Sequence, residues 1–167
     1  DSGSPTAKYS WKANGVDLQW ENAKYSVNQG LWGTSVVGEE TITSKNPLPE
    51  YAYPSQLENY ETQNIELYFK VGELVGVDEF KSEPQHCIAY LNKVASKFAI
   101  CRDIHVCDTI VGIKGRVCFE AAAALITSNA HHLLEMHTLT KWQLQHKEYL
   151  SSFYGMHLHE GQYLDPV

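Results

Sequence analysis

The N-terminal part of the chain alternates apolar or aromatic residues with polar ones, which is the period of a β-strand. The alternation continues on both sides of Asn14-Gly15, a dipeptide favoured in two-residue type I′ hairpin turns. Pairing the two arms about this turn places Trp11 opposite Leu18 on one face. The pattern therefore predicts a hairpin, and turns and short apolar runs further along extend it to an antiparallel meander over residues 7–44.

A proline-rich segment then interrupts the alternation. Three prolines fall between residues 47 and 54, and proline prevents both a helix interior and a central strand. We therefore predict an extended connector over residues 45–62. After it, the alternation from Ile65 to Val71 predicts one more strand, while a helix starting at Gln56 is the competing interpretation.

The C-terminal part of the chain changes to the helical period. Apolar residues recur at helical spacing over residues 82–101, and a second helical stretch is predicted over about residues 108–136. Capping-box patterns begin at Ser82 and at Thr140, and each predicts a helix start. The helix behind Thr140 is predicted to end at Gly155.

The four cysteines all lie in the region predicted to be helical. Cys87 and Cys101 would be ~21 Å apart on one helix, too far for a disulfide. If the first two predicted helices form an antiparallel hairpin, Cys101 lies beside Cys107 and Cys87 lies near Cys118. We therefore predict the disulfides Cys101–Cys107 and Cys87–Cys118.

This disulfide-stapled layout resembles the twin-cysteine helical hairpins of mitochondrial intermembrane-space proteins, over residues 87–118 only. The cysteine spacings depart from that family, and its function is not carried over. Disulfides persist in oxidising compartments, so the pattern favours an extracytoplasmic location: secreted, periplasmic or like the intermembrane space. The alternatives are four unpaired thiols, or a metal site, which the absence of a Cys-x-x-Cys pair disfavours.

Together these patterns predict an α+β fold, an N-terminal antiparallel β meander followed by a mainly α-helical region with a disulfide-stapled hairpin. The polar opening residues suit a tether that follows a cleaved signal peptide or a lipidated residue, as in a lipoprotein. The expected organisation is a tether over 1–6, the meander over 7–44, the connector over 45–62 and the helical region over 63–167.

Charge and hydropathy narrow the choice of partners. The chain carries a net charge of −7 without a basic patch, which weighs against nucleic acid and anionic membrane. No apolar run approaches the ~18 residues that a membrane span needs. We therefore expect a protein partner, with a lipid tether as a further possibility.

Histidines near the C-terminus form the one pattern that suggests metal chemistry. His131 and Glu135 share a helix face, and His157 and His159 follow near the end, so the four could hold Zn²⁺. The His-Glu-x-x-His pattern is absent, however, and a solvated polar helix face explains the same residues. We therefore expect no metal and no cofactor.

Aromatic residues are concentrated in the predicted β region. If exposed, they could seat a partner; the alternative is that they form the inner face of the meander. The residues concerned are Tyr9, Trp11, Trp20 and Trp32.

The sequence lacks the motifs of the common catalytic sites. It contains no Gly-x-Ser-x-Gly elbow, Walker loop or dinucleotide fingerprint. The prediction is therefore a non-catalytic binding or assembly protein, meaning an adaptor, an inhibitor or a subunit of a larger complex. The alternative is a metal-dependent hydrolase that uses the C-terminal histidines.

Overall fold

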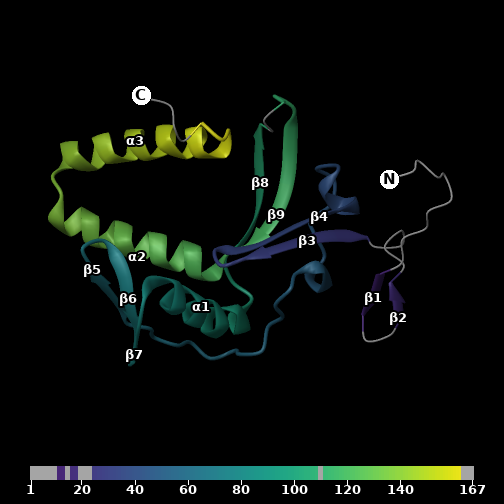
Figure 1. Ribbon diagram of the computed structural model, residues 1–167, viewed down its shortest axis with the longest axis horizontal. Helices are drawn as coiled ribbons and strands as arrows, with labels where there is room; N and C mark the ends of the chain where they lie inside the picture. The colour runs from purple at the N-terminus through teal and green to yellow at the C-terminus, as the bar shows by residue number, and fades with distance from the viewer. Residues whose placement is uncertain (1–10, 14–15, 19–23, 109–110, 163–167) are drawn as a thin grey trace, which may run out of the picture.

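Antiparallel strands form three separate sheets in this chain, and three α-helices pack beside two of them (Figure 1). The computed structural model describes residues 11–13, 16–18, 24–108 and 111–162, and these statements concern those residues. The architecture is therefore α+β. None of the described helices is long and apolar enough to cross a membrane.

The first sheet is the predicted hairpin. Strands β1 (Trp11–Ala13) and β2 (Val16–Leu18) pair antiparallel with Trp11 opposite Leu18, which confirms the predicted register. The turn at Asn14-Gly15 lies outside the described residues. The two strands pair only with each other among the described strands, so the predicted continuous meander over 7–44 is wrong.

The second sheet joins two hairpins that are far apart in the sequence. The first consists of β3 (Tyr25–Gly30) and β4 (Gly33–Gly38), and the second of β8 (Arg102–Asp108) and β9 (Lys114–Glu120). Strand β4 pairs with β9, which gives the order β3-β4-β9-β8. We call this four-stranded sheet the main sheet.

The third sheet confirms the strand predicted after the connector. It contains β5 (Leu67–Lys70), β6 (Glu73–Val77) and β7 (Phe80–Lys81), in that order. The competing prediction of a helix from Gln56 is wrong, because no helix occurs between Tyr53 and β5. This sheet lies below α2 and beside α1 in Figure 1.

The helices are α1 (Pro84–Ala95), α2 (Ala122–Thr138) and α3 (Lys141–His159). The capping box at Thr140 is confirmed, because its side chain accepts from the Gln143 backbone and the Gln143 side chain reaches back. Helix α3 passes through Gly155, so the predicted helix end there is wrong. Helices α2 and α3 lie side by side, joined by a short connection (Figure 1).

The apolar core has two separate parts. One lies where α1 and α2 meet the third sheet, and its buried residues are Leu74, Val77, Cys87, Ile88, Leu91 and Ala123. The other lies on the main sheet, where the proline-rich connector covers one face, and its buried residues are Val36, Leu48, Ala52 and Cys118. The connector, which includes the 3-10 turn η3 (Glu50–Ala52), is thus part of the packing around the main sheet.

The disulfide-stapled helical hairpin is wrong, because all four cysteines are free. The first part of the segment predicted to be the second helix, up to Glu120, belongs to the β8–β9 hairpin, and only the part from Ala122 onwards is helical, as α2. Cys101 and Cys107 therefore lie along one extended stretch, about 20 Å apart at the rise of a strand. Cys87 and Cys118 lie in the two separate parts of the core.

Candidate functional site

The face of the main sheet that the connector covers carries one apolar row and one polar row of side chains. Residues directly opposite each other on neighbouring strands share a face, so a row can be followed across all four strands. The apolar row is Val27, Val36, Cys118 and Ile104. The polar row beside it is Gln29, Thr34, Glu120 and Arg102.

Glu120 and Arg102 form the charged end of the polar row. The buried Glu120 carboxylate accepts from Arg102 Nε at 2.7 Å and from the Ser55 hydroxyl at 2.5 Å. Arg102 also donates to the Glu50 carboxylate and to the Ser55 carbonyl. The Arg102 guanidinium lies 4.3 Å from the ring centre of Tyr53, which adds a cation–π contact. A buried carboxylate is thus neutralised on the side that faces the connector.

The electrostatics of this network keep Arg102 charged. Burial acts to lower the pKa of Arg102, but its hydrogen bonds to Glu50 and Glu120 outweigh burial and the pKa is raised. Burial also raises the pKa of Tyr53, so the phenol beneath the guanidinium stays neutral near pH 7. The network therefore acts as a structural clamp between the connector and the sheet.

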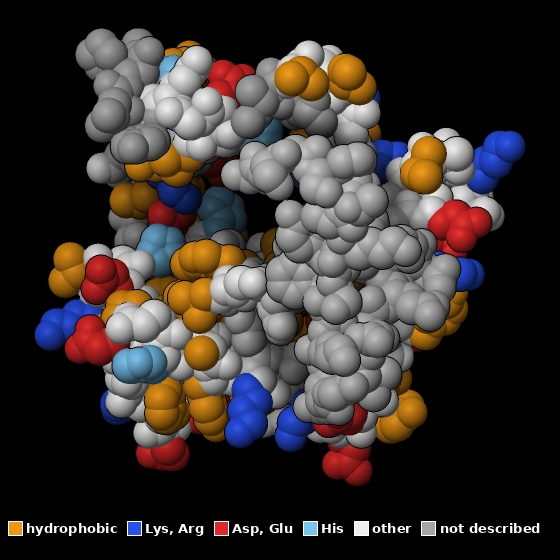
Figure 2. All heavy atoms as spheres, turned by 45° about the vertical axis from the view of Figure 1, so that its right-hand side comes forward, with side chains coloured by type: hydrophobic (Ala, Val, Ile, Leu, Met, Phe, Trp, Pro, Cys, Tyr) orange, Lys and Arg blue, Asp and Glu red, His pale blue; other side chains and the backbone are white. Residues whose placement is uncertain are grey.

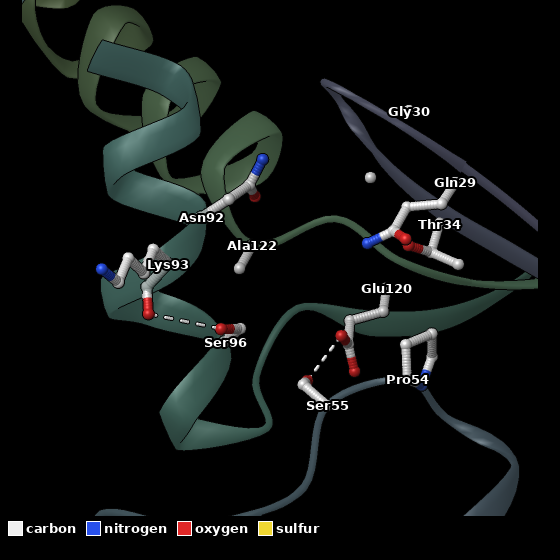
Figure 3. Close-up of a pocket in the computed structure, with 11 residues that line it drawn as sticks. Gln29, Gly30, Thr34, Pro54, Ser55, Asn92, Lys93, Ser96, Glu120 and Ala122 are labelled. Carbon is white, nitrogen blue, oxygen red and sulfur yellow. Dashed lines mark hydrogen bonds between the residues drawn. The ribbon is translucent and has the colours of Figure 1, made fainter. Parts of the chain in front are cut away.

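A cavity of about 310 Å³ adjoins the other end of the polar row (Figure 3). It lies between the main sheet, the connector, the end of α1 and the start of α2. The lining is mainly polar and consists of Gln29, Gly30, Gly33, Thr34, Pro54, Ser55, Asn92, Lys93, Ser96, Glu120 and Ala122. Figure 3 shows Gln29 and Thr34 next to each other at this space, and the Glu120 carboxylate turned towards Ser55.

Several polar groups of the cavity wall already have partners. The Asn92 side chain joins α1 to its surroundings, because it donates to the Leu31 carbonyl at 2.7 Å and accepts from the Ala123 backbone at 3.0 Å. Thr34 differs from it: its side chain is 7% exposed and its hydroxyl forms no hydrogen bond with a described residue. Thr34 therefore retains hydrogen-bonding capacity towards the cavity.

The opposite face of the main sheet carries a second row of side chains, which is polar apart from one phenylalanine and is exposed at both ends. The row runs across all four strands as Asn28, Ser35, Phe119 and Asp103. Asn28 and Asp103 are exposed, and Ser35 and Phe119 are half-buried. Ser26 and His105, both exposed, lie two residues further along β3 and β8 on the same face. We call this surface the open face.

The open face offers groups that can bind a small charged molecule. Serine hydroxyls and an asparagine amide donate hydrogen bonds to carboxylates, and the Asp103 carboxylate accepts from cations. Phe119 adds a half-buried aromatic surface in the middle of the row. None of these residues except Phe119 adds substantially to the apolar packing of the described chain.

The predicted metal ligands are divided between two helices. On α2, Glu135 lies 3.3 Å from His131 Nδ1 and 3.6 Å from His132 Nδ1. On α3, the His157 ring packs on Phe153 with centroids 4.4 Å apart. Within the described part of the chain, no group of three His, Cys, Asp or Glu residues is arranged to hold a metal ion.

Glu135 instead joins the two helices electrostatically. Its carboxylate accepts from Lys147 Nζ of α3 at 2.7 Å. The hydrogen bond from Lys147 is the main cause that lowers the pKa of Glu135, and His131 and His132 act in the same direction. Figure 2 shows histidine, acidic and basic side chains gathered where α2 and α3 lie, next to hydrophobic ones.

The predicted aromatic surface is only partly described. Trp32 is 55% exposed at the turn between β3 and β4. Trp11 lies in β1, where only the backbone is described, and Tyr9 and Trp20 lie outside the described residues. A binding role for these residues remains a prediction.

Sequence reasoning missed the polar rows on both faces. The members of one row lie up to 91 positions apart, as from Gln29 to Glu120 or from Asn28 to Phe119, and no local motif joins them. Alternation within residues 102–120 was the available signal, because it places Arg102 and Ile104 on one face and Asp103 and His105 on the other.

Comparisons with known proteins find similarity to argininosuccinate synthases. Residues 25–167 match the family model described as arginosuccinate synthase C-terminal domain. The argininosuccinate synthase of Methanocaldococcus jannaschii is 33% identical over 159 residues, covering 93% of this chain and 40% of that protein. The argininosuccinate synthase of Thermoplasma volcanium is 35% identical over 149 residues, which cover 87% of this chain and 38% of that protein. The chain thus spans about two fifths of the length of these relatives.

These matches overturn the function predicted from the sequence. Relatives that are synthases contradict both a non-catalytic adaptor, inhibitor or complex subunit and a metal-dependent hydrolase. The secreted or periplasmic location is wrong as well, because it rested on disulfides that the free cysteines exclude. The lipoprotein class is contradicted by the synthase relatives.

Proposed function

The chain belongs to the argininosuccinate synthase family, because residues 25–167 match its C-terminal domain, and we propose that it takes part in the synthesis of argininosuccinate. The open face of the main sheet is the surface that we assign to this reaction. The observation that carries the assignment is the row of Asn28, Ser35, Phe119 and Asp103, which crosses all four strands and has Asn28 and Asp103 exposed.

The chemistry of the open face suits the molecule that the family is named for. Argininosuccinate combines arginine with succinic acid, so it carries several carboxylates together with a guanidinium group. The hydroxyls of Ser26 and Ser35 and the amide of Asn28 can donate to carboxylates. The Asp103 carboxylate can pair with a guanidinium, for which a two-oxygen acceptor is the best match.

The rest of the enzyme is the partner that we expect over this face. An antiparallel sheet with one packed face commonly leaves the other to solvent or to a neighbouring domain. The relatives are more than twice as long as the matched region, so further chain is available to cover the face. Substrate held between the open face and that further chain would be shielded from water, which strengthens hydrogen bonds and ion pairs.

The test removes one hydroxyl from the middle of the row. In the full-length protein, Ser35→Ala should lower the rate of argininosuccinate formation by about tenfold or more, as expected for a lost hydrogen bond to a charged group. The control is Ser128→Ala, an exposed serine of α2 far from the row in sequence and on another element. Thermal melting of both variants verifies folding. Equal activity in Ser35→Ala and the control would show that the open face takes no part in the reaction.

A further inference from the structure

Helix α3 buries little of its surface against the rest of the described chain. None of its residues is buried, and Trp142, Leu150 and Tyr154 are each 60–61% exposed. Among the described elements, α2 is the one that α3 contacts most (Figure 1). Because apolar burial stabilises this contact only weakly, the charged groups between the two helices have a comparatively large influence on it.

These charged groups form one cluster that spans both helices. The Glu135 carboxylate of α2 lies 2.7 Å from Lys147 Nζ of α3 and 3.6 Å from His132 Nδ1 of α2. The other ring nitrogen of His132, Nε2, lies 4.0 Å from the Glu148 carboxylate of α3. His132 therefore lies between two carboxylates, one from each helix.

His131 is the other histidine that faces Glu135. Its Nδ1 lies 3.3 Å from that carboxylate, and its ring packs edge-on against Phe69 of the third sheet, with centroids 5.3 Å apart. It forms no ion pair with a described residue of α3. Among the described histidines, His132 is therefore the one whose proton acts directly on both helices.

The net charge of the cluster depends on the protonation of His132. With a neutral imidazole, Glu135 and Glu148 outnumber Lys147, so the three groups together have one excess negative charge. Imidazole changes its charge between about pH 5 and 8, unlike ordinary carboxyl and amino groups. A proton on His132 offsets the excess charge and places a cation between the two carboxylates.

We propose that His132 makes the contact between α2 and α3 sensitive to pH, so that protonation tightens the contact and deprotonation loosens it. An imidazolium that gains carboxylate partners in the closed contact stabilises that contact only while it is charged. The stabilisation is therefore present at about pH 6 and is lost as the pH rises to about 8. The inference rests on α2 and α3 alone and does not depend on the proposed function.

The test is hydrogen exchange of the α3 backbone amides in the full-length protein, at about pH 6 and about pH 8, corrected for the intrinsic exchange rate at each pH. Protection of α3 in the parent should rise from pH 8 to pH 6. In His132→Gln this rise should be smaller by about twofold to fivefold, the range that a partly exposed ion pair allows. His137→Gln is the matched control and should behave like the parent, because His137 is an exposed histidine of α2 without an ion pair to a described residue.

A second variant tests the partner on the other helix. Glu148→Gln keeps His132 but removes the carboxylate of α3 that faces it, so this variant should also reduce the rise in protection. The histidines of α3 itself are present in every variant, so their own titration cancels in the comparison. An equal rise in the parent and His132→Gln, or an unchanged rise in Glu148→Gln, would overturn the proposal. Protection that falls towards pH 6 in the parent but not in His132→Gln would overturn it as well.

Discussion

At the scale of single residues, the structure depends on a few polar side chains with well-defined partners. Arg102 is the central one, because it holds Glu120, Glu50 and Ser55 together while lying on the Tyr53 ring. A buried charge is tolerated only when it is paired and hydrogen-bonded. A single substitution at Arg102 therefore changes the charge of the network.

Replacing Arg102 with methionine should destabilise the fold strongly. The change leaves the Glu120 carboxylate buried without its cation, which costs about 3–5 kcal/mol in comparable pairs. The control is Lys114→Met, which breaks the exposed Lys114–Asp108 pair and should cost less than about 1 kcal/mol. Urea unfolding of both variants measures the difference. Similar losses in the two variants would mean that the buried network contributes little.

At the scale of elements, the sequence predicts correctly those features that depend on residues within one turn or one pair of strands. The register about Asn14-Gly15 and the capping box at Thr140 both follow from residues within a few positions of each other. The helix predicted from about residue 108 is wrong over β9, because the apolar residues of this strand also fit a helical period. Pairing with β4, far along the chain, decides that the segment is a strand.

The polar rows could not have been predicted for the same reason. Each row needs the sheet order β3-β4-β9-β8, which joins segments from both halves of the chain. The sequence shows Thr34 and Glu120 as isolated polar residues, and only the pairing of β4 with β9 places them side by side. Burial of Thr34 and the cavity beside it follow from that pairing.

The contact between α2 and α3 should depend on pH through Glu135. Its pKa is lowered from the usual 4.5, chiefly by the hydrogen bond from Lys147. A carboxylate whose pKa is lowered on folding stabilises the protein above its unfolded pKa. That contribution is therefore present above pH 4.5 and is lost as the pH falls through the lower, folded pKa.

Glu135→Gln tests this dependence. At pH 7 the free energy of unfolding of the variant should be about 0.5–1 kcal/mol lower than that of the parent. The effect is small because the ion pair is partly exposed. The difference should shrink as the pH falls below 4.5, measured by urea unfolding at each pH. Glu58→Gln is the control, because Glu58 is exposed and forms no ion pair with a described residue. A difference in the free energy of unfolding that grows below pH 4.5 would contradict the prediction that Glu135 stabilises the protein in its ionised form.

At the scale of the whole molecule, the main sheet separates two kinds of surface. One face is packed by the connector and borders the cavity, and the other is the open face. The open face is where a chain that spans two fifths of its relatives can meet the remaining part of an enzyme. Family membership and an uncovered polar row together support a role in argininosuccinate synthesis.

The most direct test is the formation of argininosuccinate by the full-length protein in cells that lack their own argininosuccinate synthase. Mass spectrometry of cell extracts measures the product. We predict that the parent protein produces argininosuccinate, and that Ser35→Ala reduces it strongly while Ser128→Ala does not. A folded, well-expressed parent protein that yields no argininosuccinate would contradict the proposed function.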